Sequence, residues 1–155
     1  MSTPPAAPAV PQGFVRIDLS TSLFLVNNGP FHVRRADGAA TLGLRVDERH
    51  CNSMGTMHGG MILAFTDVGL TLCSNIIAKT RRFLPTLSVT SDFIGPARAG
   101  DWVQMTVQVL RVTRNYMFSQ GLIETLEGAP VARVSGTLLV RGEPDPKYDG
   151  ERFFT

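Results

Sequence analysis

The chain has 155 residues, enough for one domain with a real hydrophobic core. It is 43% hydrophobic and 18% charged, and 15 basic against 13 acidic residues leave a formal net charge of only +2. This balance, without a basic run or an aromatic-studded basic patch, argues against a nucleic-acid-binding protein. Cys51 and Cys73 form no disulfide framework and no CxxC motif, so the cytoplasm is the expected location.

The N-terminal residues 1–13 are rich in Pro and Ala, with neither a positive n-region nor an apolar h-region. We therefore expect a disordered arm and not a signal peptide. Residues 14–25 have mixed apolar character and are expected to form a short helix, which the Asn-Gly-Pro sequence at 28–30 would break. Residues 31–35 and 41–47 then predict a short hairpin around an Ala-Asp-Gly turn.

The segment Gly59–Ala78 reads GGMILAFTDVGLTLCSNIIA and contains one charged side chain, Asp67. It has the length of a membrane span, but Asp67 near its centre would cost about 2.5–3.5 kcal/mol on insertion scales. We therefore favour a core helix of a folded domain, with no membrane partner. If the segment is buried, an unpaired carboxylate within it is expensive, and this makes Asp67 a candidate functional residue.

Four further strands are predicted from apolar residues that recur with a period of two, at residues 86–94, 101–112, 115–124 and 131–140. A helix that is apolar on most sides needs cover on most sides, which favours an α+β fold in which one antiparallel sheet of about six strands wraps around it. The edges of such a sheet argue for a homodimer or a dimer of dimers. The folded domain is expected to span residues 14–142, followed by a loose polar tail at 143–155.

The start of the long helix combines several residues suited to acyl chemistry. Asn52 and His58 precede two glycines, Gly59 and Gly60, which would let another group approach the free N–H donors of the first helical turn. These donors and the helix dipole stabilise negative charge, as the oxyanion of acyl transfer requires. Asp67 lies about 12 Å further along the helix by helical rise, too far to reach the same carbonyl group. A two-fold dimer would bring Gly59 of one chain to Asp67 of the other.

The pattern Asn-x-x-Gly-x-x-His-Gly-Gly, with Asp67 eight positions after Gly59, resembles the hotdog-fold acyl-CoA thioesterases of the phenylacetyl-CoA and 4-hydroxybenzoyl-CoA type. The Gly-Pro-Ala sequence at 95–97, the Gly-Asp pair at 100–101 and ARVSGTLLV at 132–140 also fit this family. The resemblance extends over residues 31–140, and it implies the hotdog fold and hydrolysis of an acyl-CoA substrate.

The resemblance also implies roles for individual residues. The Gly59 backbone N–H would polarise the thioester carbonyl, while Asn52 and His58 orient the substrate from the same side. Asp67 of the partner chain would act as a general base on water, or as a nucleophile that forms a mixed anhydride. Water suffices for this reaction, so neither a metal nor another cofactor is implied.

Further contacts with the substrate are expected around these residues. A hydroxyl that follows the helix often positions the water in this family; Thr86 is the preferred candidate, and Ser88 is an alternative with the same strand parity. Gly60 is expected beside the substrate at the helix start. Arg81 and Arg82 are candidates for contacts with the CoA phosphates, although such a cluster is also typical of a solvated helix end.

Other interpretations of these residues remain open. Asp67 could be a structural carboxylate, and a metal site from His50, Cys51, His58 and Cys73 would lack any recognised ligand spacing. Cys73 is better explained as a small buried hydrophobic residue than as a nucleophile. The alternatives to a thioesterase are a hotdog enoyl-thioester hydratase or dehydratase and a non-catalytic acyl-CoA-binding module.

Overall fold

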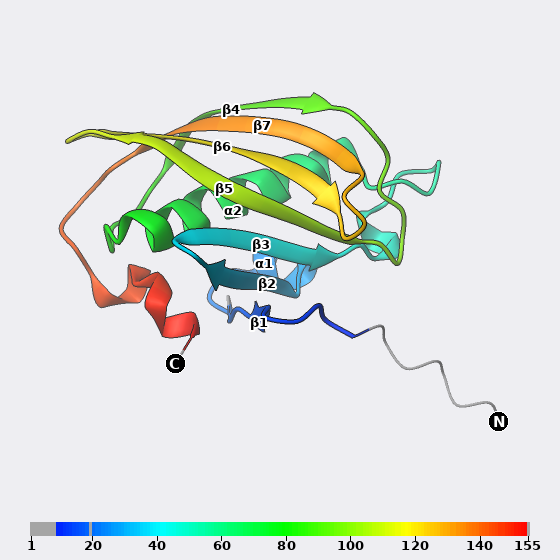
Figure 1. The fold of residues 1–155 in the computed structure, drawn as a ribbon, viewed down its shortest axis with the longest axis horizontal. Helices are drawn as coiled ribbons and strands as arrows, with labels where there is room; N and C mark the ends of the chain where they lie inside the picture. The colour runs from blue at the N-terminus through cyan, green and yellow to red at the C-terminus, as the bar shows by residue number, and fades with distance from the viewer. Residues whose placement is uncertain (1–8, 19, 155) are drawn as a thin grey trace.

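The computed structural model of the chain describes residues 9–18 and 20–154 (Figure 1). Most of the expected N-terminal arm, residues 1–8, lies outside this part. The elements are, in chain order, β1 (Val15–Arg16), α1 (Leu23–Asn28), β2 (Phe31–Ala36), β3 (Ala39–Arg45), the 3-10 helix η1 (Glu48–His50), α2 (Gly59–Ala78), β4 (Thr86–Phe93), β5 (Trp102–Val112), β6 (Tyr116–Thr125), β7 (Pro130–Leu139) and the 3-10 helices η2 (Pro146–Tyr148) and η3 (Gly150–Phe153).

In the described residues the strands form one seven-stranded antiparallel sheet with the order β1-β2-β3-β5-β6-β7-β4. Figure 1 shows this sheet curved across α2, with β4 at one edge and β1 at the other. The predicted architecture, an antiparallel sheet wrapped around one hydrophobic helix, is confirmed. The predicted bounds of the helix, Gly59–Ala78, are confirmed as well.

The expected helix over residues 14–25 is wrong in its position. Val15 and Arg16 instead form β1 opposite Val33 and His32 of β2, and the helix begins only at Leu23. A strand of two residues is too short to show a period in the sequence, and its existence depends on the edge of β2. The structure therefore has one strand more than the six predicted.

The sheet encloses α2 because most of its surface is apolar. Phe65, Leu70 and Cys73 are fully buried, and burial raises the pKa of the Cys73 thiol, as suits a small hydrophobic core residue. The helix is long and apolar enough to span a membrane by length and composition, yet 56% of its most apolar window is buried within the fold. The face of α2 that contains Leu63 and Asp67 is exposed in the single chain.

The C-terminal segment is not the loose tail that its polar composition predicted. Gly150 of η3 is buried so closely on α2 that a Cβ atom there would lie 2.2 Å from Ile76 Cγ1. Phe153 and Phe154 pack against the core, and Glu151 forms an ion pair with Arg35. The segment therefore covers the end of α2 that the sheet leaves open.

Candidate functional site

The carboxylate of Asp67 and the hydroxyl of Thr86 form a hydrogen-bonded pair. Thr86 Oγ1 donates to Asp67 Oδ1 at 2.5 Å, which joins the middle of α2 to the first residue of β4. The helix around Asp67 is buried, but its carboxylate is exposed in the single chain. Asp67 became a candidate because an unpaired carboxylate is expensive to bury. In the structure the helix is buried at this point but the carboxylate is not, so this argument does not apply to it.

A β-bulge explains why Thr86, and not Ser88, faces the helix. Thr86 pairs with Leu138 and Ser88 with Thr137, so Leu87 is an extra residue in β4. The extra residue reverses the alternation of side chains, and bulges often redirect a side chain beside an active site. Ser88 is exposed and has no hydrogen bond to Asp67. Residues two apart in a regular strand face the same side, which made Ser88 an alternative to Thr86, but the bulge between them breaks this rule.

At the start of α2, one backbone donor is free. His58 is the N-cap residue, and its Nδ1 accepts a hydrogen bond from the Gly60 N–H at 2.8 Å. In the described part of the chain, no acceptor meets the Gly59 N–H. The ring of Phe93 lies beside Gly59, since a Cβ atom there would be 3.4 Å from Phe93 Cζ. Of the two glycines, Gly59 therefore has the donor available to a ligand, while the donor of Gly60 serves the helix cap.

The side chain of Asn52 holds its own loop together. Its Oδ1 accepts from the backbone N–H groups of Met54 at 2.9 Å and Thr56 at 3.3 Å, and its Nδ2 donates to Thr56 Oγ1 at 3.0 Å. These are the contacts of an Asx-type turn. One Nδ2 hydrogen remains for a substrate, so the orienting role of Asn52 stays a prediction.

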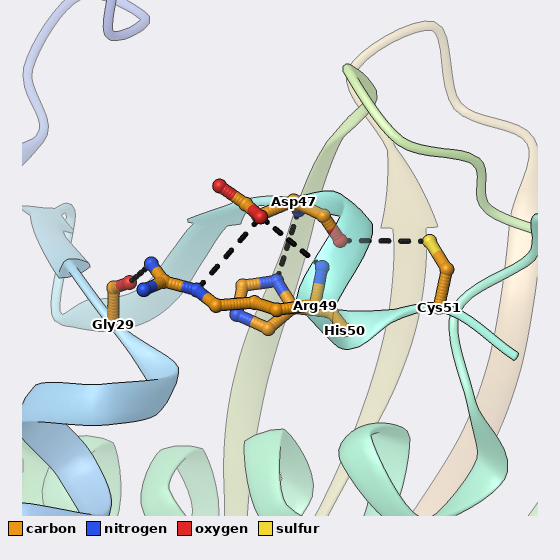
Figure 2. A network of polar contacts seen from close by, with 5 residues as sticks. All are labelled: Gly29, Asp47, Arg49, His50 and Cys51. Atoms are coloured by element: carbon orange, nitrogen blue, oxygen red, sulfur yellow. Dashed lines mark hydrogen bonds and ion pairs between the residues drawn. The ribbon is translucent and has the colours of Figure 1, made fainter.

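A polar network that the sequence analysis missed fixes the loop before α2 (Figure 2). The Asp47 N–H donates to His50 Nδ1 at 3.0 Å, and the His50 carbonyl accepts from the His58 N–H at 2.8 Å. Arg49 adds a hydrogen bond of 2.6 Å from its guanidinium to the Gly29 carbonyl. His50 thus anchors the residue that caps α2, and the Asp-x-x-His spacing of a capping box is the signal that could have indicated it.

The His50 network predicts a dependence of stability on pH. Burial, and then the nearby Arg49, lower the pKa of His50 below its ordinary value of 6.5. The unfolded chain therefore binds the proton more readily, and stability present above pH 6.5 is lost as the pH falls towards the lowered pKa. We expect the melting temperature to fall between about pH 7.5 and pH 5.5, and to fall less in His50→Asn, whose Oδ1 can still accept from Asp47.

Thermal melts of both proteins across this pH range measure the effect. His32 is also buried with a lowered pKa and contributes to both melts, so only the difference between the two proteins reports on His50. An equal fall in the two proteins would contradict the assignment.

A cavity of about 500 Å³ opens beside Asp67 and Thr86. Its walls come from the second half of α2, the segment before β4, the N-terminal residues around α1 and the C-terminal helices η2 and η3. Thr71, one turn after Asp67, lines it and donates its hydroxyl to the Asp67 carbonyl at 2.8 Å. Arg82 lines the cavity, whereas Arg81 is exposed and lies outside it.

The cavity residues contributed by η2 and η3 were missed because the tail was expected to be loose.

A metal centre has no support in the geometry: within residues 9–18 and 20–154, no three side chains of His, Cys, Asp or Glu come close enough together to hold an ion. The site therefore consists of two separate parts, the Gly59 donor at the start of α2 and the Asp67–Thr86 pair beside the cavity.

Comparison with known sequences matches this chain to thioesterases and esterases. The family model described as the thioesterase superfamily matches residues 54–132. The Pseudomonas aeruginosa protein PA0474, named as a candidate esterase, is 34% identical over 128 residues, which cover 82% of this chain and 94% of the relative. Human acyl-coenzyme A thioesterase 13 is 28% identical over 89 residues, 56% of this chain and 61% of the human protein.

A solved structure shares the fold. The PaaI protein from the phenylacetic acid degradation operon of E. coli superimposes with a TM-score of 0.71 at 20% identity, over 81% of this chain and 88% of the E. coli chain. At that identity the likeness concerns the fold alone.

Proposed function

Because this chain belongs to the thioesterase superfamily and has its hotdog fold, it is a thioester hydrolase, and we propose that it hydrolyses acyl-CoA at a site shared by the two chains of a homodimer. The acyl-CoA substrate is supported by the name of the human relative. The dimer is supported by one observation in this chain: the two parts of the site lie at opposite ends of one exposed strip.

The strip consists of one face of α2 and the adjacent edge strand β4. Gly59, Leu63 and Asp67 recur every four residues on α2, and β4 runs beside them from Thr86 at Asp67 to Phe93 at Gly59. Its apolar side chains are exposed: the exposed fraction is 41% for Leu63, 53% for Leu87 and 57% for Phe93. Such a strip on an unpaired edge strand favours association with a second copy.

A two-fold axis through the middle of the strip would place the second chain antiparallel to the first. Gly59 of one chain would then face Asp67 of the other, at both ends of the interface. An isologous interface of this kind explains why Gly59 and Asp67 can lie about 12 Å apart along one helix and still serve the same carbonyl group.

In the proposed reaction, the Gly59 N–H donates to the thioester carbonyl oxygen and stabilises the oxyanion as it forms, aided by the dipole of α2. Asp67 of the other chain removes a proton from water as the water oxygen bonds to the carbonyl carbon. The C–S bond then breaks, the thiolate of CoA takes the proton from Asp67, and the free acid leaves. Thr86 holds Asp67 Oδ1, so Oδ2 is the oxygen left to receive the proton.

The reaction class is tested on a panel of short, medium, long-chain and aromatic acyl-CoAs together with a trans-enoyl-CoA. Thiol release from a saturated acyl-CoA by the wild-type protein is the expected result. Loss of the enoyl absorbance without thiol release would indicate a hydratase instead. Tight binding of acyl-CoA without any turnover would indicate a binding module.

A further inference from the structure

The cavity beside Asp67 is lined by more basic than acidic residues. Asp67 is the one acidic residue in its described lining, and it lies at the end where the thioester would react. Arg82, Lys147 and Arg152 also line the cavity. Basic residues therefore outnumber acidic ones in the lining.

The backbone of Arg82 lies beside the C-terminal part of α2, away from Asp67. Its backbone carbonyl accepts from Asn75 Nδ2 at 2.8 Å, and Asn75 is eight residues, or about 12 Å of helical rise, beyond Asp67. Arg82 also precedes Thr86 by four residues, which an extended chain spans in at most about 14 Å. The first path places the backbone of Arg82 about 12 Å along the helix axis from Asp67, and the second sets an upper limit of about 14 Å on its distance from Thr86.

The guanidinium of Arg82 has no counter-ion in the described part of the chain. No ion pair or hydrogen bond of its side chain is formed there, although the residue is half-buried. Lys147, by contrast, is paired with Asp145 at 3.1 Å. Arg82 lines this cavity and also a second one beside Thr80 and Val140, and an anionic ligand in the first would give its side chain strong charge-assisted hydrogen bonds.

The cavity wall between Asp67 and Arg82 is mainly apolar. Val68 and Leu72 of α2, Leu84 before β4, and Phe153 of η3 line it. A hydrocarbon chain would bury its surface against such a wall, whereas the two amides of a pantetheine arm would meet fewer polar partners there than in water. This part of the cavity therefore suits an apolar acyl chain better than the pantetheine arm of CoA.

Building on the proposed thioesterase function, we infer that the acyl group of the substrate ends in a carboxylate, and that Arg82 binds this carboxylate. The preferred substrates are thus CoA thioesters of dicarboxylic acids of medium length, with the hydrocarbon chain in the apolar part of the cavity. Arg82 acts in substrate specificity and has no part in the chemical step.

The test compares matched pairs of substrates that differ only at the far end of the chain: hexanoyl-, octanoyl- and decanoyl-CoA, and their ω-carboxylated counterparts. We expect a higher kcat/KM for the carboxylated member at one or more lengths. Arg82→Gln should lower that kcat/KM roughly tenfold to a hundredfold, mainly through KM, and change the uncharged member less than about twofold. Arg82→Lys should restore part of the preference, and Arg111→Gln, an exposed residue of β5, is the matched control.

Three results would overturn this inference while leaving the thioesterase function intact. The first is that the wild-type protein shows no preference for the carboxylated substrates, and the second is that Arg82→Gln keeps the wild-type preference. The third is that Arg82→Gln lowers kcat/KM equally on all acyl-CoAs but not on pantetheine thioesters. The last would assign Arg82 to the CoA phosphates. If nothing is hydrolysed, calorimetric binding of the same pairs decides: a preference that depends on Arg82 supports the carboxylate site although the proposed reaction fails, and its absence rejects both.

Discussion

Asp67→Asn is expected to lower kcat for thioester hydrolysis by about 10²- to 10⁴-fold, the usual contribution of a positioned general base. The amide nearly preserves the shape of the side chain, and its Oδ1 can still accept the hydrogen bond that Thr86 donates. It can neither take a proton from water nor attack the carbonyl carbon. KM should therefore change little, and steady-state thiol release measures both constants.

A matched control for this variant is Asp37→Asn. Asp37 is an exposed carboxylate in the turn between β2 and β3, and its φ of 51° suits Asn equally well. Its activity should equal that of the wild type. An Asp67→Asn enzyme that retained full activity, with the control also unaffected, would exclude Asp67 from the chemical step.

The same site allows a single-turnover experiment in ¹⁸O-water. A general base directs a labelled water oxygen straight into the product acid. A nucleophilic Asp67 instead transfers one of its own unlabelled carboxylate oxygens to the acid in the first turnover, when water attacks the carboxylate carbon of the anhydride. Unlabelled acid in the first turnover would therefore identify Asp67 as the nucleophile, whereas labelled acid would exclude an anhydride that water opens at the Asp67 carbon.

The parts of the fold that depend on local pattern could be predicted from the sequence. The helix Gly59–Ala78 was predicted with its bounds because two glycines begin it and an apolar run of fixed length follows. The long strands were predicted because one face of each is buried and the other is not. Elements that exist through distant contacts could not be predicted: β1 needs the edge of β2, and η3 needs the surface of Ile76, which lies over seventy residues earlier.

The candidate site shows the same division. The spacing of Gly59 and Asp67 is visible in the sequence because both residues lie on one helix. The orientation of Thr86 is not, because it depends on a bulge at Leu87 that arises only from pairing with β7. The cavity was missed for a similar reason, since two of its walls come from terminal segments that meet α2 only in the folded chain.

A site built from two chains also makes a strong prediction for two variants that are each inactive. Gly59→Pro should lose roughly 10²- to 10³-fold in kcat, because it removes one oxyanion donor. The fold should tolerate it: Gly59 is the first residue of α2, where Pro is favoured, and His58 has the extended backbone (φ −62°, ψ 139°) that a residue before Pro prefers. Gly59→Ala keeps the N–H group and is the control, which should remain active because its added Cβ makes an ordinary contact with Phe93.

A heterodimer of Gly59→Pro and Asp67→Asn chains, isolated through two different affinity tags, is expected to recover about half of the wild-type activity. In one of its two sites, the intact Gly59 of the Asp67→Asn chain faces the intact Asp67 of the other chain. The second site combines both defects and stays inactive. If each chain instead contained a whole site, every site in the heterodimer would have one defect, and activity would not exceed the mean of the two parent variants. The thiol-release rate of the heterodimer therefore decides whether Gly59 and Asp67 of different chains act on the same substrate.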